Sequence, residues 1–314
     1  MEERHIVSHY RLNRATRREL CTHLESDLQP AIRPPTAIPP TVQLVSMLHF
    51  LATGSFLGIV EMATGISQPM FSNLLRNVLS TLVKHMDSYT QFPSSIDLPS
   101  VKVDFYALGH IHHVIGVKDG THIALIPPRV DEQVISKCTG TVKTFTPLIR
   151  LADQYIAQVT ARFRGSVHDS YMLRNSSVPQ LMVPLLRVRA YLIGEYDKCK
   201  CGYCYPSLTT QSVCDIVECK CWFTLSTGDS GYPNLSWLLT PVRNPRTRAE
   251  EQYIEVQGRT RRVVERAFGL LKARFRCLHI SGYLQYSPQK VCQIVLACCM
   301  LHNVALRRNI PLLE

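Results

Sequence analysis

The chain has 314 residues, enough for one large domain and a smaller one with ample buried core. Its 35 Lys and Arg residues outnumber its 24 Asp and Glu residues, giving a formal net charge of +11. This excess favours a nucleic-acid or other polyanionic partner. The charged N-terminus offers no signal peptide, and no apolar run is long enough to span a membrane. We therefore expect a protein of the nucleus, also present in the cytoplasm, whose 12 cysteines are reduced thiols or metal ligands.

Residues 1–100 are predicted to form an all-α N-terminal domain. Residues 1–30 have the apolar spacing of one helix, and Thr41–Thr53 is a second, apolar helix. The proline-rich stretch between them is a stiff connector. Residues 87–100 read as a loop, which we take as the boundary to a second domain at 101–314.

Within this first domain, residues 55–86 predict a helix-turn-helix. A turn containing Gly65 is followed by a second helix that begins after Ser67, and Gln68 and Arg76 are free to point outward from it. Such a unit places its second helix in the DNA major groove, so Gln68 and Arg76 are candidate DNA-binding residues. An ordinary helical hairpin uses the same glycine and is the alternative.

From residue 101 the pattern changes to short strands alternating with helices, which predicts an α/β domain. A helix is expected to begin near Asp169, and a buried, almost entirely apolar helix to begin at Ser287-Pro288. The first strand is expected to end at Asp119. The predicted strands are His113–Lys118, Phe145–Leu151, Tyr155–Phe163 and Tyr191–Gly194.

The stretch Arg259–Leu278 predicts a helix with one apolar stripe and a strongly basic remainder. Its one acid, Glu265, lies four residues after Arg261 and so shares a helix face with it. Glu265 is therefore either an exposed carboxylate paired with Arg261 or a metal-binding carboxylate beside a groove for a polyanion. The candidate DNA-binding residues of this helix are Arg261, Arg262, Arg266 and Lys272.

Three acids stand at positions suited to catalysis: Asp119 and Asp229 at strand ends, and Glu265 on the helix. Magnesium prefers carboxylate oxygens, and two such ions activate the attacking water and stabilise the leaving oxygen of a phosphodiester. Asp residues at strand ends are also common turn formers, so each acid alone is weak evidence. Their order and spacing on a basic chain favour the metal site.

Several segments of the chain together point to a known family: DGTH (119–122), GSVHDS (165–170), GDSGYP (228–233), RRVVERAFGLLKARFRCL (261–278), LQYSP (284–288) and VLACCMLHN (295–303). They resemble the PIF/Harbinger transposases, and within that family the domesticated nuclease branch of vertebrates. The resemblance implies a ribonuclease-H-like DDE nuclease fold with Mg²⁺ or Mn²⁺ as cofactor. It implies Asp119, Asp229 and Glu265 as the catalytic, metal-binding triad, and Asp169 as a further metal-binding acid. It also implies a Myb/SANT-like nuclear partner protein.

The sequence also departs from the family pattern. Lys118 puts a charge where an apolar residue is expected, and residues 135–148 lack the expected basic and His-Ser positions. The segment 195–228 separates YLIG from DSGYP, which adjoin in the family, and contains six cysteines. It is either a zinc-binding loop or translated intron.

The sequence thus predicts a transposase-derived, metal-dependent DNA endonuclease acting by phosphodiester hydrolysis or strand transfer. The alternative is a catalytically inert, domesticated DNA-binding or interaction protein.

Overall fold

The computed structural model describes most of the chain. The described residues are 2–29, 37–55, 61, 65–125, 141–150, 154–164, 169–194, 235–242, 244–279 and 284–313, and side chains are described for all of these except 141–150, 162–164 and 169–170.

The N-terminal region is helical where it is described. Its helices are α1 (Glu3–Tyr10), α2 (Arg14–Leu28), α3 (Pro40–Thr53) and α5 (Gln68–Lys84). The single helix predicted over residues 1–30 is wrong, because the chain breaks between α1 and α2. Arg11 adopts a left-handed conformation with φ 59°, and Asn13 then starts α2 by accepting a hydrogen bond on its side chain from the amide of Thr16.

Helix α5 has the two faces that were predicted for the second helix of a helix-turn-helix. Phe71 and Leu75 are buried, whereas Gln68 and Arg76 are exposed. Ser67 occupies the N-cap position but makes no side-chain capping bond. Most of the first helix of the predicted unit lies outside the described residues, so the helix-turn-helix stays a prediction.

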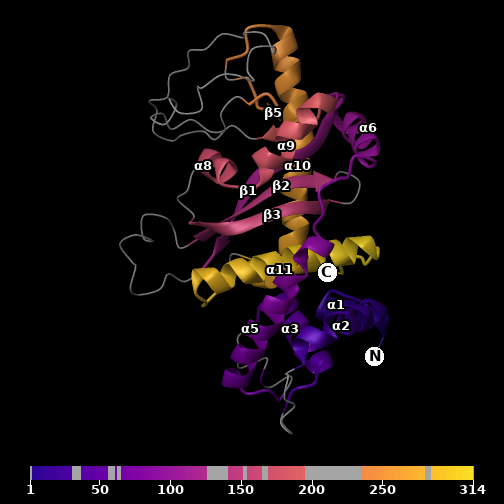
Figure 1. Cartoon of the computed structure of the whole chain (residues 1–314), viewed down its shortest axis with the longest axis vertical. Coiled ribbons are helices and arrows are strands. Elements are labelled where there is room, and N and C mark those ends of the chain that lie inside the picture. Colours follow the sequence, from indigo (N-terminus) through magenta and orange to yellow (C-terminus); the bar gives the residue numbers. More distant parts are fainter. Residues whose placement is uncertain are drawn as a thin grey trace.

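A five-stranded mixed sheet lies at the centre of the second region (Figure 1). Its strands are β1 (Val114–Ala124), β2 (Thr141–Arg150), β3 (Tyr155–Arg164), β4 (Tyr191–Gly194) and β5 (Leu238–Leu239), in the order β3-β2-β1-β4-β5. Strands β1, β2 and β3 pair antiparallel, whereas β4 pairs parallel with both β1 and β5. The prediction that the first strand ends at Asp119 is wrong, because residues 119–124 continue β1 by pairing with β2.

Helices cover this sheet. They are α6 (Leu98–Gly109), α8 (Asp169–Arg174), α9 (Val178–Leu185), α10 (Arg248–Arg274) and α11 (Pro288–Arg307), with short 3₁₀ turns at Met86–Ser88, Leu186–Val188 and Arg276–Leu278. Helix α6 was not predicted and begins inside the expected loop at 87–100. Pro99 suggested a loop, but proline is tolerated in the first turn of a helix, and Val101 and Phe105 bury one face.

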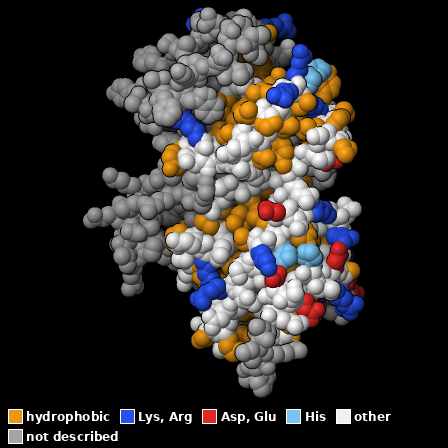
Figure 2. Space-filling view, viewed as in Figure 1, with side chains coloured by type: hydrophobic (Ala, Val, Ile, Leu, Met, Phe, Trp, Pro, Cys, Tyr) orange, Lys and Arg blue, Asp and Glu red, His pale blue; other side chains and the backbone are white. Residues whose placement is uncertain are grey.

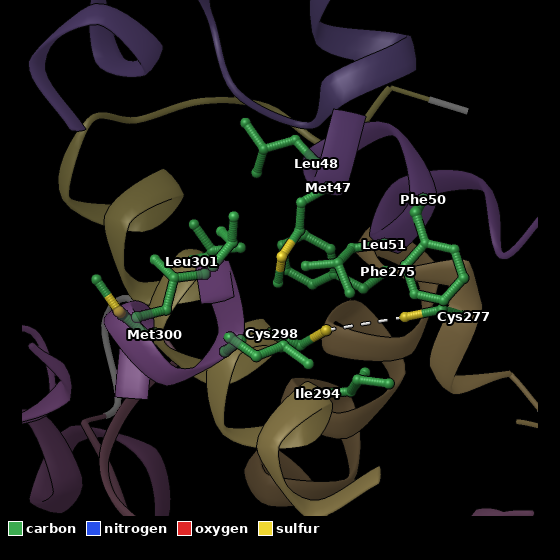
Figure 3. Packing of buried hydrophobic residues seen from close by; sticks show 14 of the residues in the cluster. Met47, Leu48, Phe50, Leu51, Phe275, Cys277, Ile294, Cys298, Met300 and Leu301 are labelled. Atoms are coloured by element: carbon green, nitrogen blue, oxygen red, sulfur yellow. Dashed lines mark hydrogen bonds between the residues drawn. The ribbon is translucent and has the colours of Figure 1, made fainter. Parts of the chain in front are cut away.

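Helix α11 lies across the molecule between the sheet and the N-terminal helices (Figure 1). It is the one helix in the described ranges that is long and apolar enough to cross a membrane, and 67% of its apolar window is buried inside the protein. Figure 3 shows the core that it shares with α3 and the end of α10, where Leu51 lies beside Phe275, and Cys277 and Cys298 approach to 3.9 Å. The N-terminal helices therefore share one core with the last helix of the chain.

Asn303 joins α11 to the edge of the sheet. Its side-chain oxygen accepts a hydrogen bond from the amide of Ile156 at 2.9 Å, and its amide donates to the carbonyl oxygens of Ile156 at 2.7 Å and Tyr89 at 2.9 Å. Ile156 lies in β3, an edge strand with backbone groups that lack a neighbouring strand. The buried asparagine satisfies those of Ile156, which gives a structural reason for the LHN segment.

Candidate active site

Asp119 lies in the central strand of the sheet, next to the end of β4. The preceding residue, Lys118, is fully buried and pairs in parallel register with Gly194, the last residue of β4. The lysine that departs from the family pattern therefore lies in the central strand of the sheet, as predicted. Asp119 is itself only partly exposed, and one carboxylate oxygen accepts a hydrogen bond from the amide of Gly120 at 2.7 Å. The carboxylate is thus held close to the point where the chain leaves β4.

Glu265 lies on α10, which is longer than the predicted basic helix. The helix begins with a capping box, in which Thr247 and Glu250 satisfy each other's backbone amides. Val264 and Phe268 are buried against the sheet as the apolar stripe predicted, and Glu265 is left on the exposed side. The stripe therefore fixes the direction in which this acid points.

Arg261 brings the two acids together. Its Nη2 atom lies 2.7 Å from Oε1 of Glu265, and its Nη1 atom lies 3.8 Å from Oδ2 of Asp119. The side chain of Arg261 is 22% exposed and that of Asp119 is 13% exposed, so solvent screens this ion pair less than pairs on an open surface. The side chain of Glu265 is 49% exposed, so its pair with Arg261 is screened more. The predicted pair of Arg261 with Glu265 is confirmed. The contact with Asp119 was not predicted, because spacing along one helix cannot reveal a partner on a strand.

The other two predicted acids are described only in part or not at all. Asp229 lies outside the described residues, as does the cysteine-rich segment before it. Asp169 begins α8, and its side chain is not described. In the part of the chain that the structure describes, there is no group of three or more His, Cys, Asp or Glu side chains able to hold a metal ion.

Asp119 and Glu265 nevertheless fit two ligands of a hard divalent cation. Both carboxylates lie beside the guanidinium group of Arg261, one on strand β1 and the other on helix α10. Both therefore border a volume that a positive charge already occupies. Carboxylate oxygens are also the donors that Mg²⁺ and Mn²⁺ prefer.

Two further side chains of α10 fasten the helix to the strands that carry the site. The Nε2 atom of the buried Gln257 donates to the carbonyl oxygen of Gly194 at 2.9 Å, and Nζ of Lys272 donates to the carbonyl oxygen of His122 at 3.1 Å. Burial lowers the pKa of Lys272. Gln257 was missed because the predicted helix began at Arg259, although the capping sequence before it could have extended the helix.

The predicted DNA-binding side chains occupy separate elements. Arg262 and Arg266 are exposed on α10, whereas Gln68 and Arg76 are exposed on α5. On the face shown in Figure 2, Lys and Arg side chains are scattered among other residues, and α10 runs behind the sheet in the same view of Figure 1. Their contact with DNA stays a prediction.

The described cysteines are free thiols, and most of them belong to the core. They are Cys21, Cys277, Cys292, Cys298 and Cys299. Burial raises the pKa of Cys292 to about 11 and that of Cys299 to about 12, which keeps both protonated and unreactive at neutral pH.

The sequence of the chain matches one family of endonucleases and several known proteins. Residues 118–303, more than half of the chain, match the model of the family described as DDE superfamily endonuclease. The chain is 30% identical over 275 residues to the Bos taurus protein named "Putative nuclease HARBI1", covering 87% of this chain and 69% of the relative. The Mus musculus protein of the same name is 31% identical over 272 residues, with coverage of 86% and 68%. "Protein ALP1-like" of Arabidopsis thaliana is 23% identical over 262 residues, with coverage of 82% and 58%. No solved structure matches the chain.

Proposed function

The chain belongs to the DDE superfamily of endonucleases, in its Harbinger transposase-derived branch, and we propose that it is a divalent-metal-dependent DNA endonuclease. It cleaves phosphodiester bonds by hydrolysis or strand transfer. The matched residues begin at Lys118, directly before Asp119, and end at Asn303, so they contain the candidate active site and the helix that supports the sheet.

One observation carries the proposal: Asp119 and Glu265, far apart in the sequence, both form ion pairs with Arg261, where helix α10 lies beside the central strand of the sheet. The strand order supports the ribonuclease-H-like form of the fold, with three antiparallel strands followed by two parallel ones. A surface without catalytic function gives no reason for one carboxylate of β1 and one of α10 to lie beside the same arginine.

Asp119 and Glu265 would hold the metal together with Asp229 and, as a further ligand, Asp169. When bound, Mg²⁺ or Mn²⁺ supplies a nucleophilic water and stabilises charge on the leaving oxygen. Arg261 keeps the two described carboxylates aimed at one point, and the bonds of Gln257 and Lys272 hold α10 in register with β1 and β4. Exposed Arg262 and Arg266 bind the phosphates that flank the scissile bond.

Targeting is part of the proposal. Gln68 and Arg76 on α5 read the DNA sequence, and a Myb/SANT-like partner protein in the nucleus adds specificity, as the family resemblance implies. The basic net charge of +11 suits a nuclear, DNA-associated protein that is also present in the cytoplasm.

A nuclease assay with Mg²⁺ or Mn²⁺ tests the proposal when wild type is compared with Asp119→Asn and Glu265→Gln. Both variants should lose several orders of magnitude in cleavage rate and bind Mn²⁺ more weakly, because each removes a metal ligand. Glu255→Gln is the matched control, since Glu255 is an exposed acid of the same helix that pairs only with Arg259 in the described contacts.

Equal cleavage by wild type and both variants would contradict the assignment of these acids. DNA binding without metal binding or cleavage in the wild type would instead favour the inert alternative.

A further inference from the structure

Two arginines away from the candidate active site are buried where three segments of the chain meet. Arg11 closes α1 and is 5% exposed, and Arg274 is the last residue of α10 and is 3% exposed. The third segment is the stretch after α11. Arg274 directly precedes Phe275, whose ring lies in the apolar core drawn in Figure 3. Arginine is almost never buried to this degree unless it is paired.

The hydrogen bonds that these arginines make are to neutral groups. Arg11 Nη1 donates to the carbonyl oxygen of Leu313 at 2.9 Å, and Arg274 Nη2 donates to that of Ile310 at 3.1 Å. Ile310 and Leu313 are three residues apart, so their carbonyl groups are separated by at most about 10 Å. Arg11 Nε and both Nε and Nη1 of Arg274 are buried without a hydrogen-bond partner among the described residues.

The charges of these groups add rather than cancel. Neither Arg11 nor Arg274 forms an ion pair with any Asp or Glu side chain that the structure describes. Burial, and then the charge of Arg11, lower the pKa of Arg274 to about 10, and burial and Arg276 lower the pKa of Arg11. Both still carry their charge at neutral pH. Water could satisfy the N–H donors, but it would leave two buried like charges uncompensated.

We propose that Arg11 and Arg274 form a buried binding site for one small oxyanion of the phosphate or carboxylate type. The planar guanidinium fork matches the spacing of two oxygens on such an anion and binds it through paired, charge-assisted hydrogen bonds. DNA does not fit, because the backbone of a duplex cannot reach side chains that are about 95% buried. The bound anion would fasten the end of α1, the end of α10 and the chain after α11 to one another.

The same oxygens have two sources: a free anion from solution, or a carboxylate of Glu314, which lies outside the described residues. A second chain distinguishes them, carrying Glu314→Gln and a Gly-Ser-Gly-Ser extension after residue 314. The probe for both chains is inorganic phosphate, compared with chloride at equal ionic strength, at neutral pH and with EDTA present.

The experiment measures thermal unfolding midpoints of wild type, Arg274→Met, Arg11→Met and the extended chain. Phosphate should raise the midpoint of the wild type by several degrees, in proportion to the logarithm of its concentration, with one phosphate bound per chain by calorimetry. Arg274→Met and Arg11→Met should lose this response. Without phosphate they should be at least as stable as the wild type, since an apolar side chain replaces an uncompensated charge. Arg248→Met, an exposed arginine of the same helix, should respond like the wild type.

A phosphate response that appears only in the extended chain also supports the site and assigns its oxyanion to Glu314. Two results overturn the proposal: no response in either chain, or an equal response in Arg274→Met and Arg248→Met. The second result would show general ion binding. Because two different arginines are tested, a folding failure in one variant leaves the other to decide.

Discussion

Helix α10 holds two arginines in opposite environments, one near its middle and one at its C-terminal end. Arg261, near the middle of the helix, is partly exposed and contacts two carboxylates, whereas Arg274, at its end, is 3% exposed and contacts a backbone carbonyl. At Arg261, two acids compensate the guanidinium charge and remain near solvent, so a metal ion could replace the guanidinium group beside them. At Arg274, the guanidinium group is buried and no described acid compensates its charge. One basic stretch of sequence therefore places its arginines in two different environments.

Removing residues 195–228 should have the largest effect, and it should act at the site around Arg261 alone. Gly194 pairs with Lys118 in parallel register, so a residue joined directly to Gly194 would stand beside Asp119, about 5 Å away across the strands. In the deletion chain that residue is Asp229. Because a misplacement of 1 Å can cost about 100-fold in rate, metal-dependent cleavage should rise by up to that factor, and the unfolding midpoint should also rise.

Residues 229–237 would still connect β4 to β5 in the shortened chain, since nine extended residues span roughly 30 Å. The response of the Arg274 end to phosphate should not change. A deletion chain that is less stable than the wild type would contradict the translated-intron hypothesis, as would stoichiometric zinc on the wild type. Sequencing the transcript tests the intron origin itself.

The sequence predicted the elements better than it predicted the contacts between them. Period-two patterns located β2, β3 and β4, and the apolar stripe oriented Glu265, because both depend on local periodicity. The contact of Arg261 with Asp119 could not be predicted, since it depends on how α10 crosses β1. The burial of Arg274 was equally hidden: seven basic residues look alike in the stretch, and only packing separates them.

Changing Arg261 to Gln tests whether this side chain compensates the two acids. Without metal, Asp119 and Glu265 should repel each other, and the variant should lose about 1 kcal/mol of stability, discounted for the partial exposure of the pair. The gain in unfolding midpoint on adding Mn²⁺ should be larger than in the wild type, because the metal then relieves an uncompensated repulsion. Thermal unfolding with EDTA and with Mn²⁺ measures both. Equal midpoints for variant and wild type in EDTA would show that Arg261 does not compensate the acids.

Between Arg261 and Arg274, the exposed arginines of α10 should govern the salt dependence of DNA binding. Changing Arg262 and Arg266 to Ala should reduce the slope of log affinity against log salt by up to about 1.8, at roughly 0.9 per phosphate contact. Lys272→Ala should change the slope less, because Lys272 donates to the carbonyl oxygen of His122. Gln68→Ala and Arg76→Ala are the comparison variants. They should alter the preference for DNA sequence and leave the slope almost unchanged. An unchanged slope in the double variant would show that this face of α10 does not bind DNA.

The smallest expected effect comes from a compensated pair far from α10, where Asp27 of α2 meets two residues at the end of α5. Its carboxylate oxygens lie 2.6 Å from Nζ of Lys84 and 2.6 Å from Nε2 of His85, and these hydrogen bonds, that of Lys84 first, lower the pKa of Asp27 below its ordinary 3.8. A lowered folded-state pKa gives stability that is fully present above 3.8 and is lost as the pH falls through the lowered value. Asp27→Asn should therefore lower the unfolding midpoint slightly at neutral pH and flatten its decline as the pH falls below 3.8. Arg274→Met should leave that acid decline as it is, since no described acid pairs with Arg274. If the midpoint of Asp27→Asn instead falls in parallel with that of the wild type as the pH is lowered, Asp27 contributes no pH-dependent stability. Compensation by exposed partners would then matter only where burial supports it, as it does at Arg261.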